Sequence, residues 1–235
     1  MPTSRPDAPV AIVTGASRGL GLALARELAA RGWRLVIDAR GGEALERARA
    51  ELAARTTVDA LVGDVTDPRH REALVTAAGD RVDLLVNNAS RLGPSPQPPL
   101  HRYPLDELER VYATNVHAPL ALAQLALPLM GEGAMVLNIS SDAAVEAYEG
   151  WGGYGSSKAA LEQLTRILAV EHPTLRVHAV DPGDMNTQMH QEAFPGEDIS
   201  DRPPPEDSVP GLIALIDGDL PSGRYRANEV AQVAR

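Results

Sequence analysis

Short apolar segments alternate with longer segments of helical periodicity along this chain, and this alternation restricts its fold more than any other feature. The apolar segments are rich in Val, Leu and Ile, and they are Val10–Val13, Arg34–Ala39, Ala60–Val62, Leu84–Val86, Met135–Ile139 and Val177–Val180. Such segments are typical of strands buried on both faces. The helical candidates are Leu20–Arg31, Glu43–Ala54, Pro68–Ala78, Leu105–Leu129 with a break near Asn115, and Ser156–Glu171. Strand and helix in succession predict an α/β fold with a doubly wound, mostly parallel sheet and helices on both faces.

The length of 235 residues suits one sizeable domain, which we expect to span residues 1–235 with tails at 1–8 and 229–235. The absence of cysteine excludes disulfides, thiolate nucleophiles and Cys-ligated zinc, and it fits a reducing compartment. A net charge of −10 argues against nucleic-acid or anionic-membrane partners. No apolar run has the length of a signal peptide or a membrane span, so we expect a cytoplasmic protein.

Two proline-rich segments, Gly93–Pro104 and Phe194–Pro210, follow predicted strand ends, where open α/β sheets bind ligands. Each is either a surface loop stiffened by proline or a part of a substrate site. We expect residues 188–210 to form a substrate lid. The second segment is acidic, which favours a solvated lid over a site for a cationic substrate.

A glycine-rich turn, T-G-A-S-R-G-L-G, follows the first predicted strand and opens into a helix. A dinucleotide's pyrophosphate needs a tight turn, backbone without Cβ where it approaches, and the free N–H groups of a helix N-terminus. This turn supplies all three. The sequence therefore predicts a nucleotide site, and the residues assigned to it here are Gly15, Ser17, Arg18, Gly19, Leu20 and Gly21.

The spacing G-x-x-x-G-x-G resembles that of the short-chain dehydrogenase/reductase family, and residues 9 to 228 follow the order of that family's motifs. The resemblance implies a Rossmann-like domain that binds NAD(P). It also implies that Asp64 and Val65 contact the adenine and that Asn88 and Ala89 follow the fourth strand beside the cofactor. Ser90 stands where the family has a glycine, which puts the local loop geometry in question.

The residue at the end of the second predicted strand decides between NADP(H) and NAD(H). Asp38 is a candidate for the carboxylate that holds a ribose hydroxyl, but the family's selecting position falls on Ala39. Strand alternation points Asp38 to the opposite side from Ala39. Arg18 and Arg40 resemble a pair that grips a 2′-phosphate, so NADP(H) is favoured over NAD(H). The alternative is that both are solvated surface arginines.

Tyr154 and Lys158 stand four residues apart at the beginning of a predicted helix, which places them on one face. Lys158 is the single lysine among 22 basic residues. A neighbouring ammonium favours the phenolate, so Lys158 is expected to lower the pKa of Tyr154 toward the working pH of an acid–base catalyst. Lysine is a compact charge with three donors, able to reach a ribose and Tyr154 together.

The resemblance implies two further catalytic residues. Ser141 matches the serine that donates a hydrogen bond to the substrate oxygen, with Ser140 as its rival. Asn115 matches the asparagine that holds a water relaying protons through Lys158; the alternative is an ordinary helix break. Near the predicted sixth strand end, the family's nicotinamide-binding segment falls on Pro182, Gly183, Met185 and Thr187. Six scattered histidines show no metal-ligand spacing, so no metal is expected.

The sequence thus predicts an NADP(H)-dependent oxidoreductase that interconverts a carbonyl and an alcohol on a small organic substrate. The four catalytic residues would be Asn115, Ser141, Tyr154 and Lys158. The alternative is a non-catalytic NAD(P)-binding sensor or interaction protein on the same fold. Tyr148, Trp151 and Met189 either line the substrate site or pack within loops. Residues Ala118–Leu129 are apolar nearly all round, which favours a homodimer or homotetramer.

Overall fold

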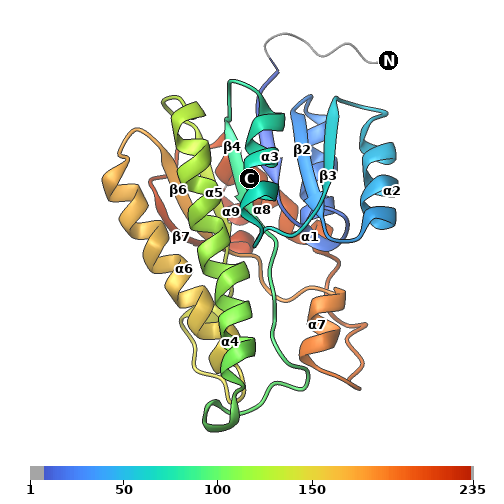
Figure 1. The fold of residues 1–235 in the computed structure, drawn as a ribbon, viewed down its shortest axis with the longest axis vertical. Helices are drawn as coiled ribbons and strands as arrows, with labels where there is room; N and C mark the ends of the chain where they lie inside the picture. The colour runs from blue at the N-terminus through green and yellow to red at the C-terminus, as the bar shows by residue number, and fades with distance from the viewer. Residues whose placement is uncertain (1–7, 234–235) are drawn as a thin grey trace.

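The computed structural model describes residues 8–233, which form a seven-stranded parallel sheet in the order β3-β2-β1-β4-β5-β6-β7 (Figure 1). The strands are β1 (Val10–Val13), β2 (Arg34–Ala39), β3 (Val58–Val62), β4 (Leu84–Asn87), β5 (Met135–Ile139), β6 (Arg176–Asp181) and β7 (Gly223–Arg226). All six predicted strands are present. The sheet order reverses direction between β1 and β4, where doubly wound folds place their ligand crevice.

Helices cover both faces of the sheet, as the apolar runs require. On one face lie α1 (Gly19–Ala30), α2 (Gly42–Leu52), α8 (Val209–Asp217) and α9 (Ala227–Val233). On the other lie α3 (Pro68–Ala78), α5 (Ala118–Ala126) and α6 (Gly152–Glu171). In β1, Ala11 and Val13 join the first core, whereas Val10 and Ile12 join the second. Burial on both sides therefore explains why the central strands are mostly apolar.

The long predicted helix from Leu105 breaks where expected. Helix α4 (Leu105–Tyr112) passes into a π-helical turn at Ala113–His117, which leads into α5 and a 3₁₀ turn at Leu127–Leu129. A π-helical turn inserted in an α-helix frequently marks a functional site, and Asn115 lies in the middle of this one. Figure 1 shows α4 and α5 running as one column beside α6.

Three features differ from the sequence-based expectation. Helix α6 begins at Gly152 rather than Ser156, so Tyr154 lies inside its first turn. The predicted lid contains α7 (Gln188–Ala193) and a 3₁₀ turn at Pro205–Ser208, and α8 follows directly. Helix α9 occupies most of the expected C-terminal tail, whereas the expected N-terminal tail lies almost wholly outside the described residues. Within residues 8–233, no helix is both long enough and apolar enough to span a bilayer.

Candidate active site

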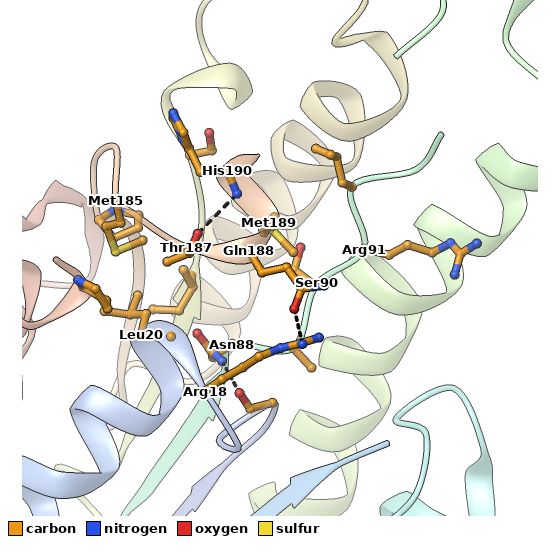
Figure 2. A pocket seen from close by; sticks show the side chains of 18 of the residues that line it. Arg18, Leu20, Asn88, Ser90, Arg91, Met185, Thr187, Gln188, Met189 and His190 are labelled. Atoms are coloured by element: carbon orange, nitrogen blue, oxygen red, sulfur yellow. Dashed lines mark hydrogen bonds between the residues drawn. The ribbon is translucent and has the colours of Figure 1, made fainter. Parts of the chain in front are cut away.

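A cavity of about 830 Å³ opens at the carboxyl edge of the sheet, and its lining comes from segments that follow strands β1 to β6. All the predicted site residues line this cavity except Gly21 and Asn115, which lie directly behind it. Figure 2 shows Arg18 and Leu20 from the glycine loop facing Met185, Thr187 and Gln188 across this space. The fold thus brings the separate sequence motifs into one site.

The loop between β1 and α1 is shaped by its glycines. Gly15 has a φ of +66°, which favours glycine, and its N–H donates to Asp38 Oδ1 at 2.7 Å. A Cβ on Gly21 would lie 2.5 Å from Asn88 Nδ2, so no larger residue fits. Helix α1 has no side-chain cap, which leaves its first N–H groups available to an anion. Uncapped N–H groups beside bare backbone fit the pyrophosphate of a dinucleotide.

Asp38 is committed to the protein rather than to a ligand. Its carboxylate is buried, and besides Gly15 N–H it contacts His70 Nε2 at 2.8 Å. Asp38 and Ala39 both line the cavity, and Arg40 is exposed beside them. Arg18 donates to the Gln188 side chain of α7, which is one of the dashed contacts in Figure 2. Both arginines therefore line the cavity, and one of them is tied to the lid.

The loops after β3 and β4 complete this end of the cavity. Burial would raise the pKa of Asp64, but hydrogen bonds from the Thr66 N–H and hydroxyl outweigh that effect and lower it. Asp64 is therefore a carboxylate acceptor at neutral pH. Asn88 donates to the Thr14 carbonyl at 2.8 Å and the Gly15 carbonyl at 3.2 Å. Its side chain thus fixes the glycine loop.

Tyr154 and Lys158 are both buried at the inner end of the cavity. Lys158 Nζ donates to the Ile139 carbonyl at 2.7 Å and lies 5.4 Å from the centroid of the Tyr154 ring. Burial raises the pKa of Tyr154 to about 12 and lowers the pKa of Lys158 to about 7. Desolvation disfavours the charged form of both groups, so the predicted lowering of the Tyr154 pKa by Lys158 is wrong for this structure.

The structure distinguishes Ser141 from its rival. Ser140 is buried and donates to Glu162 Oε1 at 2.5 Å, so its hydroxyl points to the protein interior. Ser141 donates to Asp142 Oδ1 at 2.9 Å, and hydrogen bonding from its side chain lowers the pKa of Tyr154 against the larger effect of burial. The Ser141 side chain thus lies beside Tyr154 at the cavity.

Asn115 uses its whole side-chain amide within the protein. Its Oδ1 accepts from the Arg91 N–H at 2.8 Å and the Ser90 hydroxyl at 3.2 Å. Its Nδ2 donates to the Arg91 carbonyl and the Ser157 hydroxyl, both at 2.9 Å. The side chain therefore clamps the loop after β4 against α6, and the predicted water relay stays a prediction.

The segment after β6 closes the cavity from the other side. Gly183 N–H donates to Asp181 Oδ1 at 3.0 Å, and Thr187 caps α7 by accepting from the His190 N–H at 3.2 Å (Figure 2). Trp151 and Met189 line the cavity, which answers one alternative left open by the sequence. Tyr148 is half-exposed and packs edge-on against Trp151.

Comparison with known proteins decides the family. The model of the short chain dehydrogenase family matches residues 9–198. The 2-(R)-hydroxypropyl-CoM dehydrogenase of Xanthobacter autotrophicus is 36% identical over 203 residues, covering 82% of this chain and 81% of that protein. The chain belongs to the short-chain dehydrogenase family. It is accordingly an oxidoreductase of carbonyl and alcohol substrates that uses an NAD(P) dinucleotide.

Two further relatives support the assignment to short-chain dehydrogenases. The rhamnolipids biosynthesis 3-oxoacyl-[acyl-carrier-protein] reductase of Pseudomonas aeruginosa is 36% identical over 238 residues, covering 96% of this chain and 87% of that protein. A short-chain dehydrogenase from Shigella flexneri complexed with NADP superposes with a TM-score of 0.86 at 27% identity. That comparison covers 94% of this chain and 97% of the other, so the similarity includes the whole fold.

The structure of this short-chain dehydrogenase adds a buried charged network that sequence reasoning missed. Glu162, on α6, accepts from Ser140 and from Arg224 Nε of β7 at 2.9 Å. Arg224 also donates to the Ser141 carbonyl at 3.3 Å and contacts Asp181 Oδ2 at 3.4 Å. The network joins the strand ends of β5, β6 and β7 beneath the catalytic groups.

Ser90 is a further residue whose role only the structure reveals. Its hydroxyl donates to Asn115, and hydrogen bonding from it lowers the pKa of Tyr154, although burial raises that pKa more. The replacement of the family's glycine thus places a second serine hydroxyl, besides that of Ser141, beside Tyr154. Among residues 8–233, no group of three His, Asp or Glu side chains could hold a metal ion.

Proposed function

We propose that this short-chain dehydrogenase interconverts a ketone or aldehyde and an alcohol with NADP(H), using Tyr154 as the acid–base group. The observation that carries the proposal is the meeting of the Tyr154 and Ser141 side chains at the inner end of the dinucleotide cavity, with Lys158 buried beneath them. The bound dinucleotide supplies the hydride. A carbonyl oxygen between the two hydroxyls would accept a hydrogen bond from each.

The proton in this reaction comes from Tyr154. A phenol with a pKa near 12 is protonated at neutral pH, so Tyr154 is ready to donate to the substrate oxygen as the carbonyl carbon gains hydride. The products are then an alcohol, the oxidised dinucleotide and a tyrosinate. Lys158 stabilises that tyrosinate when its amine is protonated, because a positive charge nearby favours the phenolate. In the reverse direction each transfer runs backwards.

A preference for NADP(H) is the second part of the proposal. Arg18 and Arg40 both line the cavity, and two guanidinium groups would suit the 2′-phosphate of the bound dinucleotide. Asp38 does not compete, because its carboxylate is engaged by Gly15 and His70. We expect kcat/KM with NADPH to exceed that with NADH at least about tenfold.

One experiment tests both parts. A panel of ketones and aldehydes is run with NADPH and NADH, on the wild-type protein and on Arg40→Ala, with Arg47→Ala as the control. Arg47 is an exposed arginine of α2 outside the cavity. Arg40→Ala should lower the NADPH to NADH ratio, and Arg47→Ala should not. A preference for NADH would contradict the cofactor assignment, and tight NADPH binding without oxidation on any substrate would favour a sensor.

The assembly is part of the same proposal. Helices α4, α5 and α6 expose large apolar side chains, at Leu105, Leu125, Ile167 and Val170. A second copy of the chain would cover this surface in a homodimer or homotetramer. Light scattering of the purified protein measures the molecular mass, and a monomer would contradict the assembly. The acidic, cysteine-free chain also fits the proposed cytoplasmic location.

A further inference from the structure

Half of the aromatic residues of this chain gather at one end of the cavity. The chain has only two Trp, five Tyr and one Phe. Trp151 lies at the centre of the cluster, with ring centroids 6.2 Å from Tyr148, 5.9 Å from Tyr154 and 5.8 Å from Phe194. In a core built from Ala, Leu and Val, such a concentration beside the acid–base group needs an explanation.

Apolar side chains complete the wall around these rings. Leu92, Ala143 and Tyr154 form a buried cluster against which Trp151, Met189 and Ala193 pack. Met189 and Ala193 belong to α7, and Phe194 follows it directly, so the lid helix contributes one side of this wall. Figure 2 shows Met189 on the same side of the cavity as Gln188. A planar apolar group in this space would meet ring edges and faces and a thioether.

Three acidic side chains lie around this end of the cavity. Asp142, Asp184 and Glu192 line the cavity here. Arg91, the arginine that lines this end, is engaged by Glu107 at 2.7 Å, and Figure 2 shows it pointing away from Thr187 and Met189. His190 Nδ1 lies 3.9 Å from Asp184 Oδ1. Arg18 also lines the cavity, and its guanidinium donates to the Gln188 side chain. A carboxylate or phosphate on the substrate would therefore meet like charge, and both Arg18 and Arg91 already have side-chain partners.

We infer that the substrate is an aryl ketone, or the corresponding benzylic alcohol, that carries no anionic group. Its ring packs against Trp151 while its carbonyl oxygen faces Tyr154 and Ser141. This inference rests on the proposed carbonyl chemistry and adds the substrate class to it. One favourable ring pair is worth about two- to twelvefold in binding beyond its buried area.

The test compares ketones that differ in one property. Acetophenone and cyclohexyl methyl ketone have the same carbon skeleton, but only the first has an aromatic ring, and 4-acetylbenzoate adds a carboxylate to it. With NADPH, we expect kcat/KM for acetophenone to exceed that for each of the other two by about tenfold. If kcat/KM for acetophenone exceeds that for the other two ketones by less than about threefold, the inference is overturned. Oxidation of NADPH with the alkyl ketone would in that case still uphold the proposed function. No oxidation on any ketone would overturn the proposed function itself.

Substitutions of Trp151 test whether the aromatic cluster causes the preference for aryl ketones. Trp151→Leu keeps an apolar side chain without a ring and should bring the aryl to cyclohexyl ratio close to one, whereas Trp151→Phe should retain the preference. Trp33→Leu is the matched control. Trp33 directly precedes β2, so it lies at the amino ends of the strands, whereas the cavity lies at their carboxyl ends. An unchanged ratio in Trp151→Leu would place the aromatic selectivity elsewhere and overturn the assignment to this cluster.

Binding is measured separately from turnover. In Trp33→Phe, Trp151 is the single tryptophan, so its fluorescence reports on this end of the cavity. With NADP⁺ present, acetophenone should quench this emission saturably, and 4-acetylbenzoate should do so only at concentrations at least about tenfold higher. Trp151→Phe, which retains Trp33, should show no saturable quenching. Equal quenching by the neutral and anionic ketones would overturn the charge part of the inference.

Discussion

The Lys158 side-chain nitrogen lies 5.4 Å from the centroid of the Tyr154 ring, and both side chains are buried. The separation of four residues on α6 places them together, and packing against β5 removes them from water. Burial therefore moves the two pKa values in opposite directions, upward for the phenol and downward for the amine. At neutral pH the tyrosine holds its proton firmly, and the lysine is poised to exchange one.

Tyr154→Phe removes the proposed proton donor and nothing else. We expect kcat/KM for ketone reduction to fall about 10²- to 10⁴-fold, the usual contribution of a positioned acid. The melting temperature should stay within a few degrees, because the ring and its contacts remain. Tyr225→Phe is the control, since this hydroxyl bonds to the Pro221 carbonyl far from the cavity. Full turnover in Tyr154→Phe would remove Tyr154 from the mechanism.

The pH dependence of stability provides a direct measure of the Lys158 environment. The folded pKa of about 7 lies below the ordinary value of 10.5, so the unfolded chain binds more protons between these values. Stability should therefore rise with pH from about 7 to 10, by up to about 1.4 kcal/mol per pH unit. The chain has no cysteine and no second lysine, so few other side chains titrate there. Above pH 10 the raised Tyr154 pKa acts in the opposite sense.

Lys158→Met isolates this effect. Urea unfolding at pH 7.5 and 9.5 should show a rising free energy of unfolding in the wild type and a nearly flat one in the variant. At pH 7.5 the variant should be the more stable protein by at least about 1 kcal/mol, because it no longer buries an amine. Its reductase activity should nearly vanish. A variant that is less stable than wild type, with the same pH slope, would show that Lys158 is not desolvated.

The sheet and the Tyr154–Lys158 pair could be predicted from local sequence, because strands buried on both faces leave continuous apolar runs and a spacing of four fixes one helical face. Helix α8 was missed since Pro210 and Gly211 interrupt its pattern at the first turn. The raised pKa of Tyr154 could not be predicted from the sequence either. Burial depends on what packs over the ring, and no local motif reports it.

The pairing of Glu162 with Arg224 joins residues 62 positions apart, and no periodic signal connects a helix to the last strand in this way. Arg224→Met should leave the buried Glu162 carboxylate without its partly buried cation and cost about 3–5 kcal/mol. Because Arg224 also holds the Ser141 carbonyl, kcat should fall as well. Arg166→Met is the matched control: Arg166 contacts the same carboxylate at 3.4 Å but is largely exposed, so its loss should cost less than about 0.5 kcal/mol.

A double-mutant cycle then tests whether the pair acts as a unit. Glu162→Gln removes the carboxylate charge with little change of shape, and in that background Arg224→Met should cost at least about 1 kcal/mol less than it does in the wild type. Urea unfolding of the four proteins gives this coupling. Strict additivity would mean that Arg224 stabilises the fold through Asp181 and the Ser141 carbonyl alone.

His178, on β6, is expected to limit stability in acid. The side chain is fully buried, and neither ring nitrogen has a hydrogen-bond partner among residues 8–233. Burial, aided by the charge of Arg176, lowers its pKa to about 4. The unfolded chain, with a histidine pKa near 6.5, therefore binds more protons than the folded chain between pH 6.5 and 4, and stability is lost as the pH falls through this window.

His178→Phe keeps a ring against Tyr225, whose centroid lies 5.3 Å away, and removes the titrating group. We expect the free energy of unfolding of this variant to fall less steeply between pH 6.5 and 4.5 than that of the wild type. The exposed His101 offers the control, since His101→Phe should leave the wild-type slope unchanged. Urea unfolding at four pH values measures the slopes. Equal slopes in His178→Phe and the wild type would mean that His178 is protonated as readily in the folded chain as in the unfolded one.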